Sequence, residues 1–574
     1  MFNTLRKLSK IIQITKIQNV FLLFIFICIN ALVELISLGI LIPFVTLIIE
    51  PNFFNDFQLF LNNQKFYNFS YFLNLSRKDF ILSLITLMII FFMFRFFVNI
   101  FYVWYLNSKK VEYENIISIK ILSNISKINY SSYLNISSSE LINNITGRVP
   151  MVTGSIVALA NIMVEILILS VISIILFFEF PSKSAIIISI TLLIFLLINI
   201  FYRKFIVLWS IERGKGGDLR TQNLVDFFLG IREVIIYSLQ NFFIKDFLSA
   251  NKKFLNSQKK ILIFNSLPRI IIEFLLSLIF LGFFFYTLTN NFLTNDIILS
   301  ASIILILSLR IFPSFNRILF NFNTMKYGTE SIYKISNFLV STEKNFIDKK
   351  DVTFKKKIQI KNLSFGFTKD FTILENLNFE ILKNKKIGIS GESGSGKTTF
   401  IDILTGLLKP TKGDISVDEI NIYDANVSSW IKKISFIQQK VFIFNSSLRQ
   451  NITLVNDNQM IDKKKLDKIL ELSDLKNFVN SKQNLELFNV GEFGNNLSGG
   501  QKQKVGLARA LYQDSEILIL DESTNAIDEV SERKIIENIL SLNDKTIIFI
   551  THNLKNLVNF DETFKFEQKK LVKY

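Results

Sequence analysis

The chain has 574 residues, half of them hydrophobic, and 60 are phenylalanine. The mean hydropathy of +0.37 excludes an ordinary soluble protein. The net charge of +17 could suit a nucleic-acid binder, but the basic residues flank apolar segments and no RNA- or DNA-binding module is recognisable, so we expect no nucleic-acid partner.

Six apolar stretches in the first part of the chain are long enough to cross a membrane. A hydrocarbon core about 30 Å thick requires about 20 apolar residues of helix. The first stretch is too long for the core of a signal peptide, so we expect it to be retained. The six predicted transmembrane helices cover residues 19–48, 80–106, 152–180, 185–211, 264–289 and 296–320.

The basic residues predict the orientation of these helices, because lysine and arginine stay on the cytoplasmic side. They are frequent in the first 18 residues and in residues 107–151 and 212–262, which we expect to form long loops. The N-terminus, both long loops and the chain after the sixth helix are therefore predicted to be cytoplasmic.

Two other features of this half are less informative. Cys28 is the only cysteine, so an intrachain disulfide and a cysteine-based metal site are excluded. The aromatic-rich segment after the first helix, residues 51–79, suits an amphipathic surface segment and an ordinary loop equally well.

Charged residues inside the predicted helices are the main indication of a cargo, because a charge in a bilayer is costly. Arg95, Arg269 and Arg310 lie in or at the second, fifth and sixth helices, and Glu34 and Glu165 in the first and third. One explanation is that each of these arginines, and Arg317 near the end of the sixth helix, pairs with a glutamate or snorkels to a lipid head group. An arginine-lined path for an anionic, phosphate-bearing cargo is the other, since guanidinium groups bind phosphate in bidentate fashion.

The second half of the chain contains the motifs that predict nucleotide binding and catalysis. "KKIGISGESGSGKTTFIDIL" is read as a strand, a glycine-rich turn and a helix beginning near Lys397, and Gly391–Thr398 fits the phosphate-loop pattern G-x-x-x-x-G-K-[ST]. Backbone N–H groups, the helix N-terminus and the lysine suit phosphate, and Thr398 suits Mg²⁺. The predicted ATP-binding residues here are Gly391, Gly394, Ser395, Gly396, Lys397, Thr398 and Thr399.

Downstream, "DSEILILDESTNAID" predicts a buried strand, Ile517–Leu520, that ends in two carboxylates. Such an acidic pair is often only a solvated turn. After a phosphate loop, however, Asp521 suits a contact to Mg²⁺ and Glu522 suits the general base that orients the attacking water.

Between these motifs stands "LSGGQ", Leu497–Gln501, and the order of motifs from Phe365 to His552 resembles the ATP-binding-cassette ATPases. The resemblance implies that Phe367 stacks on adenine, that Gln439 senses the γ-phosphate and contacts Mg²⁺, and that His552 is a catalytic switch residue. It also implies nucleotide contacts for Ser498, Gly499, Gly500 and Gln501 of the signature and for Asp528 of the D-loop.

Departures from the family pattern are small. Phe367 replaces the usual tyrosine, Gln438 stands where a proline is common, and "LDEST" replaces "LDEAT". None removes a charge or a phosphate ligand, so we expect a competent ATPase and not a binding-only cassette.

The resemblance also implies a dimer, because ATP lies between the phosphate loop of one cassette and the signature of another. This chain has one of each, so a homodimer is the economical arrangement, although a heterodimer stays open. The expected fold is a six-span helical domain of exporter type, residues 1–320, a linker, residues 321–355, and an α/β nucleotide-binding domain with a helical subdomain, residues 356–574.

The membrane half adds a looser resemblance. "ELISLGILIPFVTL", "SELINNITGRV", "PRIIIE" and "RIFPSFNRI" are similar to bacterial lipid-linked oligosaccharide flippases of the PglK type. This implies ATP-driven movement of a polyprenyl-diphosphate glycan to the outer leaflet, in the bacterial inner membrane. Two alternatives stay open: an exporter of another amphipathic cargo, such as a lipid A precursor or a hydrophobic drug, and a non-transporting membrane sensor.

His552, in "IIFITHNLKN", is the only histidine. A single histidine at a strand end is often an ordinary surface or core residue. If the strand Ile547–Thr551 and the phosphate-loop strand share one sheet, however, His552 reaches the crevice at the strand ends, where a hydrogen bond to the γ-phosphate or to water is useful.

Overall fold

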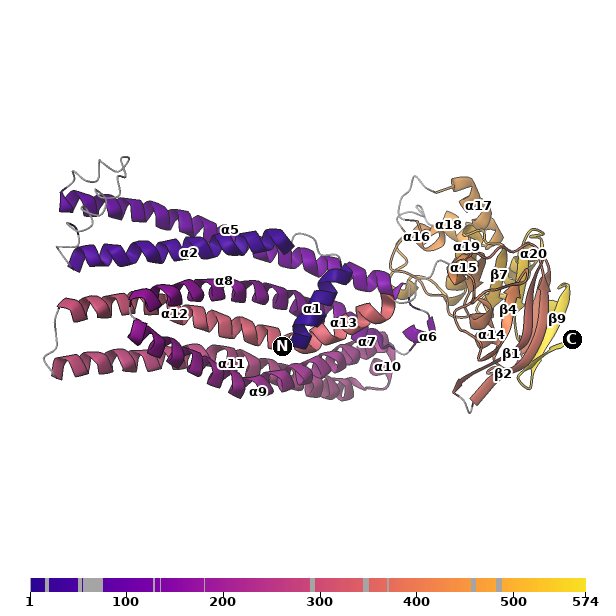
Figure 1. Ribbon diagram of the computed structural model, residues 1–574. Coiled ribbons are helices and arrows are strands. Elements are labelled where there is room, and N and C mark those ends of the chain that lie inside the picture. Colours follow the sequence, from indigo (N-terminus) through magenta and orange to yellow (C-terminus); the bar gives the residue numbers. More distant parts are fainter. Residues whose placement is uncertain are drawn as a thin grey trace. The chain divides into compact units, whose positions relative to one another are not determined.

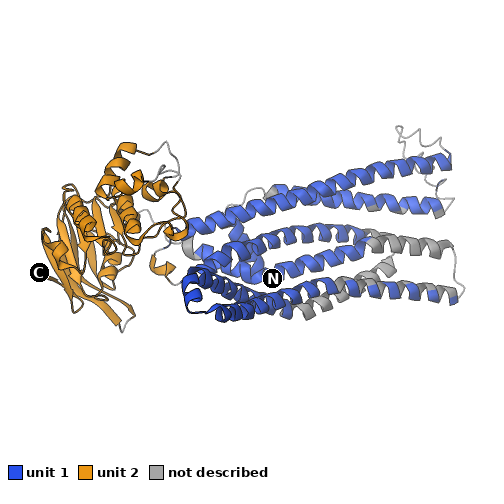
Figure 2. Cartoon of the chain, turned by 180° about the vertical axis from the view of Figure 1, so that it is seen from behind, with its two compact units in different colours: residues 1–128, 135–345 blue, residues 129–134, 346–574 orange. Residues whose placement is uncertain are grey.

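The computed structural model describes most of the chain and divides it into two compact units. Unit 1 is formed by residues 1–128 and 135–345, and unit 2 by residues 129–134 and 346–574 (Figure 2). The described residues are 2–15, 20–49, 54, 76–126, 128, 130–134, 136–179, 181–289, 295–343, 350–368, 371–455, 461–481 and 488–574.

Unit 1 is helical, and its long helices lie side by side as a bundle (Figure 1). The short helices are α1 (Phe2–Thr15), α7 (Ser138–Asn143), the π-helix η2 (Asn144–Arg148), α10 (Ile231–Ile236) and α13 (Thr329–Glu343). The long helices are α2 (Val20–Ile49), α5 (Arg77–Ile125), α8 (Val149–Glu179), α9 (Pro181–Leu229), α11 (Gln240–Thr289) and α12 (Asn295–Tyr327).

Three of these helices run far beyond the apolar windows that the sequence indicates. The segments 107–151 and 212–262, predicted to be long loops, are largely helix, because α5, α9 and α11 continue through them. Polar helices of this kind are supported by charge pairs one turn apart. In α5, Lys109 lies 2.6 Å from Glu112, and Lys110 lies 3.8 Å from Glu114.

Three helical segments among the described residues are long and apolar enough to cross a membrane: Leu22–Ile48, Arg77–Ile125 and Ser138–Ile174. Much of the predicted fourth to sixth spans lies outside the residues whose side chains the structure describes, so these spans stay predictions from the sequence. In the aromatic-rich segment 51–79, the structure describes only Phe54 and the residues from Ser76 onward.

Buried hydrophobic side chains hold the helices of unit 1 together. One cluster joins α2, α5 and α8 through residues such as Ile27, Tyr102 and Ile168. A second joins α1, α5 and α13 through Ile11, Ile117 and Ile335. The helices α12 and α13 occupy part of the segment 321–355, which the sequence assigned to a linker.

Unit 2 is an α/β domain with two sheets, and it includes the short helix α6 (Tyr130–Tyr133). The first sheet has the order β2-β1-β4-β5 and the second β10-β9-β3-β8-β7-β6. In the second sheet β3, β8, β7 and β6 are parallel neighbours. The strands are β1 (Lys357–Thr368), β2 (Phe371–Leu382), β3 (Lys386–Gly391), β4 (Lys412–Val417), β5 (Ile420–Asn421), β6 (Ile434–Ile437), β7 (Ile517–Asp521), β8 (Thr546–Ile550), β9 (Glu562–Glu567) and β10 (Lys570–Lys573).

Buried hydrophobic residues fix the parallel strands, since every position of β7 and of β8 is buried. A separate apolar cluster forms a helical subdomain around Ile452, Leu470 and Val505. The helices of unit 2 are α14 (Lys397–Leu404), α15 (Val427–Ile431), α16 (Leu448–Thr453), α17 (Lys463–Leu472), α18 (Lys476–Asn480), α19 (Gly499–Tyr512) and α20 (Glu529–Leu540), with 3₁₀ turns η4 (Glu492–Gly494) and η5 (Leu554–Leu557).

Candidate functional site

The parallel strands of unit 2 bring four of the predicted motifs to one edge of the sheet. β3, β6, β7 and β8 all run in the same direction. The segments that follow them therefore leave the sheet at the same edge, which is where open α/β sheets bind ligands. These segments hold the phosphate loop, Gln439, Glu522 and His552.

The phosphate loop joins β3 to α14, as the sequence predicted. Gly394 and Gly396 have φ values of +81° and +101°, a region that favours glycine. A Cβ on Gly396 would also lie 2.8 Å from Leu374. The Lys397 Nζ donates hydrogen bonds of 2.8 Å to the carbonyls of Gly391 and Glu392, so the lysine head lies over the loop.

Ser395 adds a second polar group to this loop. Among the described residues its buried Oγ has no hydrogen-bond partner, which is uncommon for a buried hydroxyl. An orphaned donor, a lysine head and a helix N-terminus together fit a phosphate group.

The carboxylates at the end of β7 contact this loop. Thr398 Oγ1 lies 3.3 Å from Asp521 Oδ2. Burial, followed by the charge of Glu522, raises the pKa of Asp521, and burial and Asp521 raise the pKa of Asp402 to about 6. Crowded buried carboxylates beside a threonine hydroxyl form a donor set that suits Mg²⁺, whose charge would offset their repulsion.

Glu522 is held in a strained conformation at the tip of β7. Its φ of +46° lies in the left-handed region, and its N–H donates to the Ile550 carbonyl of β8 at 3.0 Å. Its carboxylate accepts a 2.8 Å hydrogen bond from Gln439 Nε2 and lies 3.6 Å from Lys397 Nζ. Two residues that the sequence assigned to catalysis are thus in contact.

His552 follows β8, which pairs with the phosphate-loop strand β3 in parallel register. The Thr551 N–H donates to the Ile389 carbonyl at 3.1 Å, so the two strand ends are aligned. The prediction that both strands share one sheet is confirmed. The His552 side chain is exposed beside this edge.

The signature "LSGGQ" is the start of α19 and forms a capping box. Ser498 Oγ accepts from the Gln501 N–H, and Gln501 Oε1 accepts from the Ser498 N–H at 2.9 Å. A Cβ on Gly500 would lie 2.7 Å from the Ala526 carbonyl. The absence of a side chain at Gly500 therefore lets the D-loop lie against the N-terminus of α19, while Asp528 caps α20.

Phe367 lies near the end of β1 with an exposed fraction of 62%. Its ring contacts the buried Phe365 edge-on, with centroids 5.1 Å apart. An exposed ring on a fixed strand is available for stacking. The roles of Phe367, Ser498 and Asp528 in nucleotide binding stay predictions.

The arginines that the sequence assigned to a cargo path are paired with glutamates. Arg95 lies 2.7 Å from Glu34, and Arg310 lies 3.3 Å from Glu34 and 3.9 Å from Glu165. Arg317, for which the sequence left snorkelling open, lies 2.5 Å from Glu165. The side chain of the third arginine of that set, Arg269, lies outside the described residues.

Sequence reasoning missed the link between the helical subdomain and the D-loop helix. Asp474, just after α17, accepts hydrogen bonds from Lys504 of α19 at 2.7 Å, from Ser531 at 2.9 Å and from Lys534 at 2.8 Å. The one unusual local feature of Asp474 is its left-handed backbone conformation, with φ at +53°. No motif pattern marks it, because its partners lie 30 to 60 residues away.

Comparisons with known proteins agree with this geometry. The family model of the ABC transporter transmembrane region matches residues 20–312, just over half of the chain, and the ABC transporter ATP-binding model matches residues 374–525. The fold and the strand-end site define an ATP-binding membrane transporter. The chain belongs to the ATP-binding-cassette transporter family.

Two curated relatives and one solved structure are similar to this chain over different shares of its length. The heterocyst differentiation ATP-binding protein HepA of Nostoc is 29% identical over 79% of this chain and 74% of its own length. The ATP-dependent lipid A-core flippase of Pasteurella multocida is 34% identical, but the match spans only 40% of this chain and 39% of that protein. A bacterial Atm1-family exporter with ATP bound has a TM-score of 0.76 at 18% identity, covering 96% and 94% of the two chains. The predicted fold class is confirmed.

Proposed function

We propose that the strand-end site hydrolyses ATP, with Glu522 as the base that orients the attacking water. The contact between Gln439 and Glu522 at 2.8 Å, beside Lys397, is the observation that carries the proposal. Lys397 and the loop N–H groups bind the phosphates, and His552 donates a hydrogen bond to the γ-phosphate or to the water.

Mg²⁺, when bound, would supply positive charge that offsets the negative charge of the phosphate groups. Thr398 and Asp521, whose side-chain oxygens lie 3.3 Å apart, would hold it, with Gln439 as a further oxygen ligand. Phe367 stacks on the adenine. Ser498, Gly499, Gly500 and Gln501 of one chain, with Asp528, complete the nucleotide site of a second copy, so the working unit is a homodimer.

The proposed cargo is an anionic lipid-linked oligosaccharide, moved to the outer leaflet of the bacterial inner membrane. Support comes from the charge cluster in unit 1. Three guanidinium groups, Arg95, Arg310 and Arg317, face two carboxylates, Glu34 and Glu165. Three guanidinium groups against two carboxylates leave an excess positive charge that a diphosphate group would neutralise.

A second candidate cargo is a lipid A precursor. The name of the Pasteurella relative favours it, and a phosphorylated lipid shares the anionic chemistry. A hydrophobic drug is the third, and it lacks the negative charge that the arginine cluster favours. The contacts of Glu522 with Gln439 and Lys397 count against a non-transporting sensor, because a protein that only binds ATP does not require all three residues.

The cargo can be tested by its effect on ATP hydrolysis by the purified protein in lipid nanodiscs. We expect a polyprenyl-diphosphate glycan to raise the hydrolysis rate at least about twofold, because cargo binding favours the closed site. A lipid A precursor and a hydrophobic cation serve as the other two arms. Stimulation by either of these alone, and not by the glycan, would redirect the assignment.

A further inference from the structure

A cavity of about 620 Å³ lies inside unit 1, between η2 and α8 on one side and α9, α11 and the α12–α13 junction on the other. This volume is typical of sites for organic ligands. Among the described residues, the cavity wall includes neither Arg95 nor Arg310, and all of its lining residues belong to unit 1. Part of its wall consists of glycines, among them Gly147, Gly154 and Gly217.

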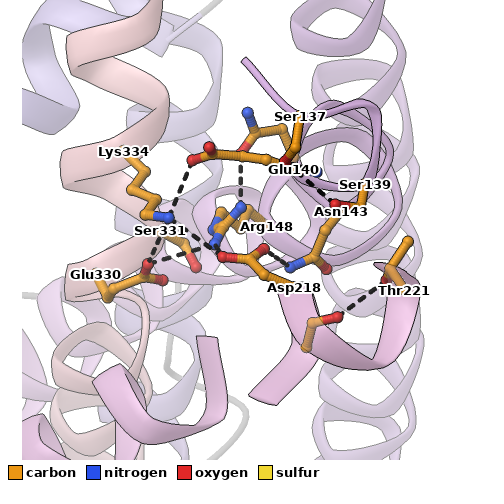
Figure 3. A network of polar contacts seen from close by, with 12 residues as sticks. Ser137, Ser139, Glu140, Asn143, Arg148, Asp218, Thr221, Glu330, Ser331 and Lys334 are labelled. Carbon is orange, nitrogen blue, oxygen red and sulfur yellow. Dashed lines mark hydrogen bonds and ion pairs between the residues drawn. The ribbon is translucent and has the colours of Figure 1, made fainter. Parts of the chain in front are cut away.

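One of the three arginines among the described residues of the cavity wall, Arg148, is held in ion pairs. The buried Arg148 lies 2.6 Å from Asp218, donates a 2.8 Å hydrogen bond to Asn144 and lies 3.6 Å from Glu330 (Figure 3). Glu330 also lies 3.9 Å from Lys334. The charges of Arg148 and of Glu330, the acidic residue of the cavity wall, therefore offset each other.

Arg213 and Arg220, the other two arginines of the cavity wall, differ from Arg148 in their contacts. They lie seven residues apart on α9, two helical turns, and their guanidinium groups stack on the ring of Phe254 at 4.6 Å and 4.2 Å. In the part of the chain that the structure describes, no carboxylate lies within ion-pair distance of either one. Arg213 Nη1 donates to the weak acceptor Met151 Sδ at 3.1 Å, and its Nε is buried without a partner.

The cavity thus offers two guanidinium groups that form no ion pair among the described residues, beside apolar side chains that include Ile261 and Leu262. Guanidinium groups match the geometry of phosphate oxygens. A phosphate group carries a charge of about −1.5 to −2 near neutral pH, which would balance both arginines, whereas a single carboxylate would leave one uncompensated.

We propose that this cavity binds an organic phosphate, with its phosphate or diphosphate group between Arg213 and Arg220 and its apolar part against Ile261 and Leu262. The site does not depend on which cargo the transporter moves. A lipid head group and a soluble sugar phosphate share this chemistry, and binding measurements distinguish the two sources.

The test is calorimetric titration of the full-length protein in detergent, in a Lys397→Ala background that removes phosphate binding at the nucleotide site. The probes are farnesyl diphosphate, farnesol and glucose 1-phosphate. We expect farnesyl diphosphate to bind and farnesol not to. Binding of glucose 1-phosphate with similar affinity would assign a soluble phosphate, and much weaker binding a lipid head group.

Two variants locate the binding. Arg213→Gln/Arg220→Gln removes the charges, and we expect at least tenfold weaker binding of farnesyl diphosphate. Gly154→Leu adds a side chain to the cavity wall, at a position where a Cβ meets no atom within 4 Å. It should weaken binding equally. Arg232→Gln, on an exposed arginine, and Gly39→Leu, where a Cβ also meets nothing within 4 Å, are the matched controls and should stay within twofold.

Unchanged affinity for farnesyl diphosphate in both cavity variants would overturn the proposal. Equal binding of farnesol would overturn it as well, because the phosphate would then play no part. The proposal would also be overturned if the Lys397→Ala protein bound neither farnesyl diphosphate nor glucose 1-phosphate.

Discussion

At the scale of single residues, the strand-end site depends on where Glu522 is held. Its left-handed backbone, with φ at +46°, directs the carboxylate toward Gln439 and Lys397. The sequence predicted the roles of these residues because the motifs are local. The ion pairs of Arg95 and Arg310 were left open between two explanations, because their partners lie 61 or more residues away.

Glu522→Gln should reduce ATP hydrolysis by a factor of about 100 or more, because the amide cannot accept a proton. Binding of ATP should be spared, since the amide is isosteric and the phosphate loop is intact. The rate is measured by phosphate release and binding by a fluorescent ATP analogue. Glu529→Gln, in the first turn of α20, is the control. Full turnover in the Glu522 variant would remove the assignment of the base.

At the scale of elements, the apolar pattern predicted the helix cores and the buried strands, and composition could not predict how far the helices continue. The apolar window of the second predicted span covers residues 80–106, whereas α5 is Arg77–Ile125. Beyond the membrane, polar residues with helix propensity and pairs such as Lys109–Glu112 continue the helix. Contacts between residues far apart in the chain, such as the hydrogen bonds of Asp474, are likewise not marked by a local sequence pattern.

Asp474 is expected to stabilise the contact between the signature helix α19 and α20. Burial opposes ionisation, but hydrogen bonds from Lys504, Lys534 and Ser531 lower the pKa of Asp474 to about 2. Asp474→Asn should cost about 1–2 kcal/mol. Because the folded pKa is depressed, the contribution is full above the unfolded pKa of about 3.9 and is lost as the pH falls through about 2.

This difference is measurable by urea unfolding followed by the fluorescence of Trp430, the buried tryptophan of unit 2. Trp104 and Trp209, the other two of the three tryptophans, are replaced by phenylalanine. The exposed Asp467→Asn on α17 is the control and should change stability by less than about 0.5 kcal/mol. Equal effects of the two variants at pH 6 would show that the Asp474 link is not stabilising.

At the scale of the whole molecule, one phosphate loop and one signature per chain favour the proposed homodimer, in which two copies share each nucleotide site. Ser393→Cys in the loop and Gly499→Cys in the signature test this in a Cys28→Ser, Glu522→Gln background with ATP. A Cβ at Gly499 makes only an ordinary contact, 3.6 Å from Ala526. We expect a short bismaleimide to give covalent dimers on a denaturing gel. Chains with only one of the two cysteines are the control, and an equal yield from them would contradict the shared site.

The most direct measurement of the central claim is ATP-dependent flipping of a labelled polyprenyl-diphosphate glycan in proteoliposomes. The wild-type protein should move the label between leaflets with ATP, and the Glu522→Gln protein should not. Arg95→Ala/Arg310→Ala should lose flipping while keeping most basal hydrolysis, because these residues contact Glu34 in unit 1 and not the nucleotide. A wild-type protein that hydrolyses ATP and leaves the labelled glycan in its original leaflet would contradict the account.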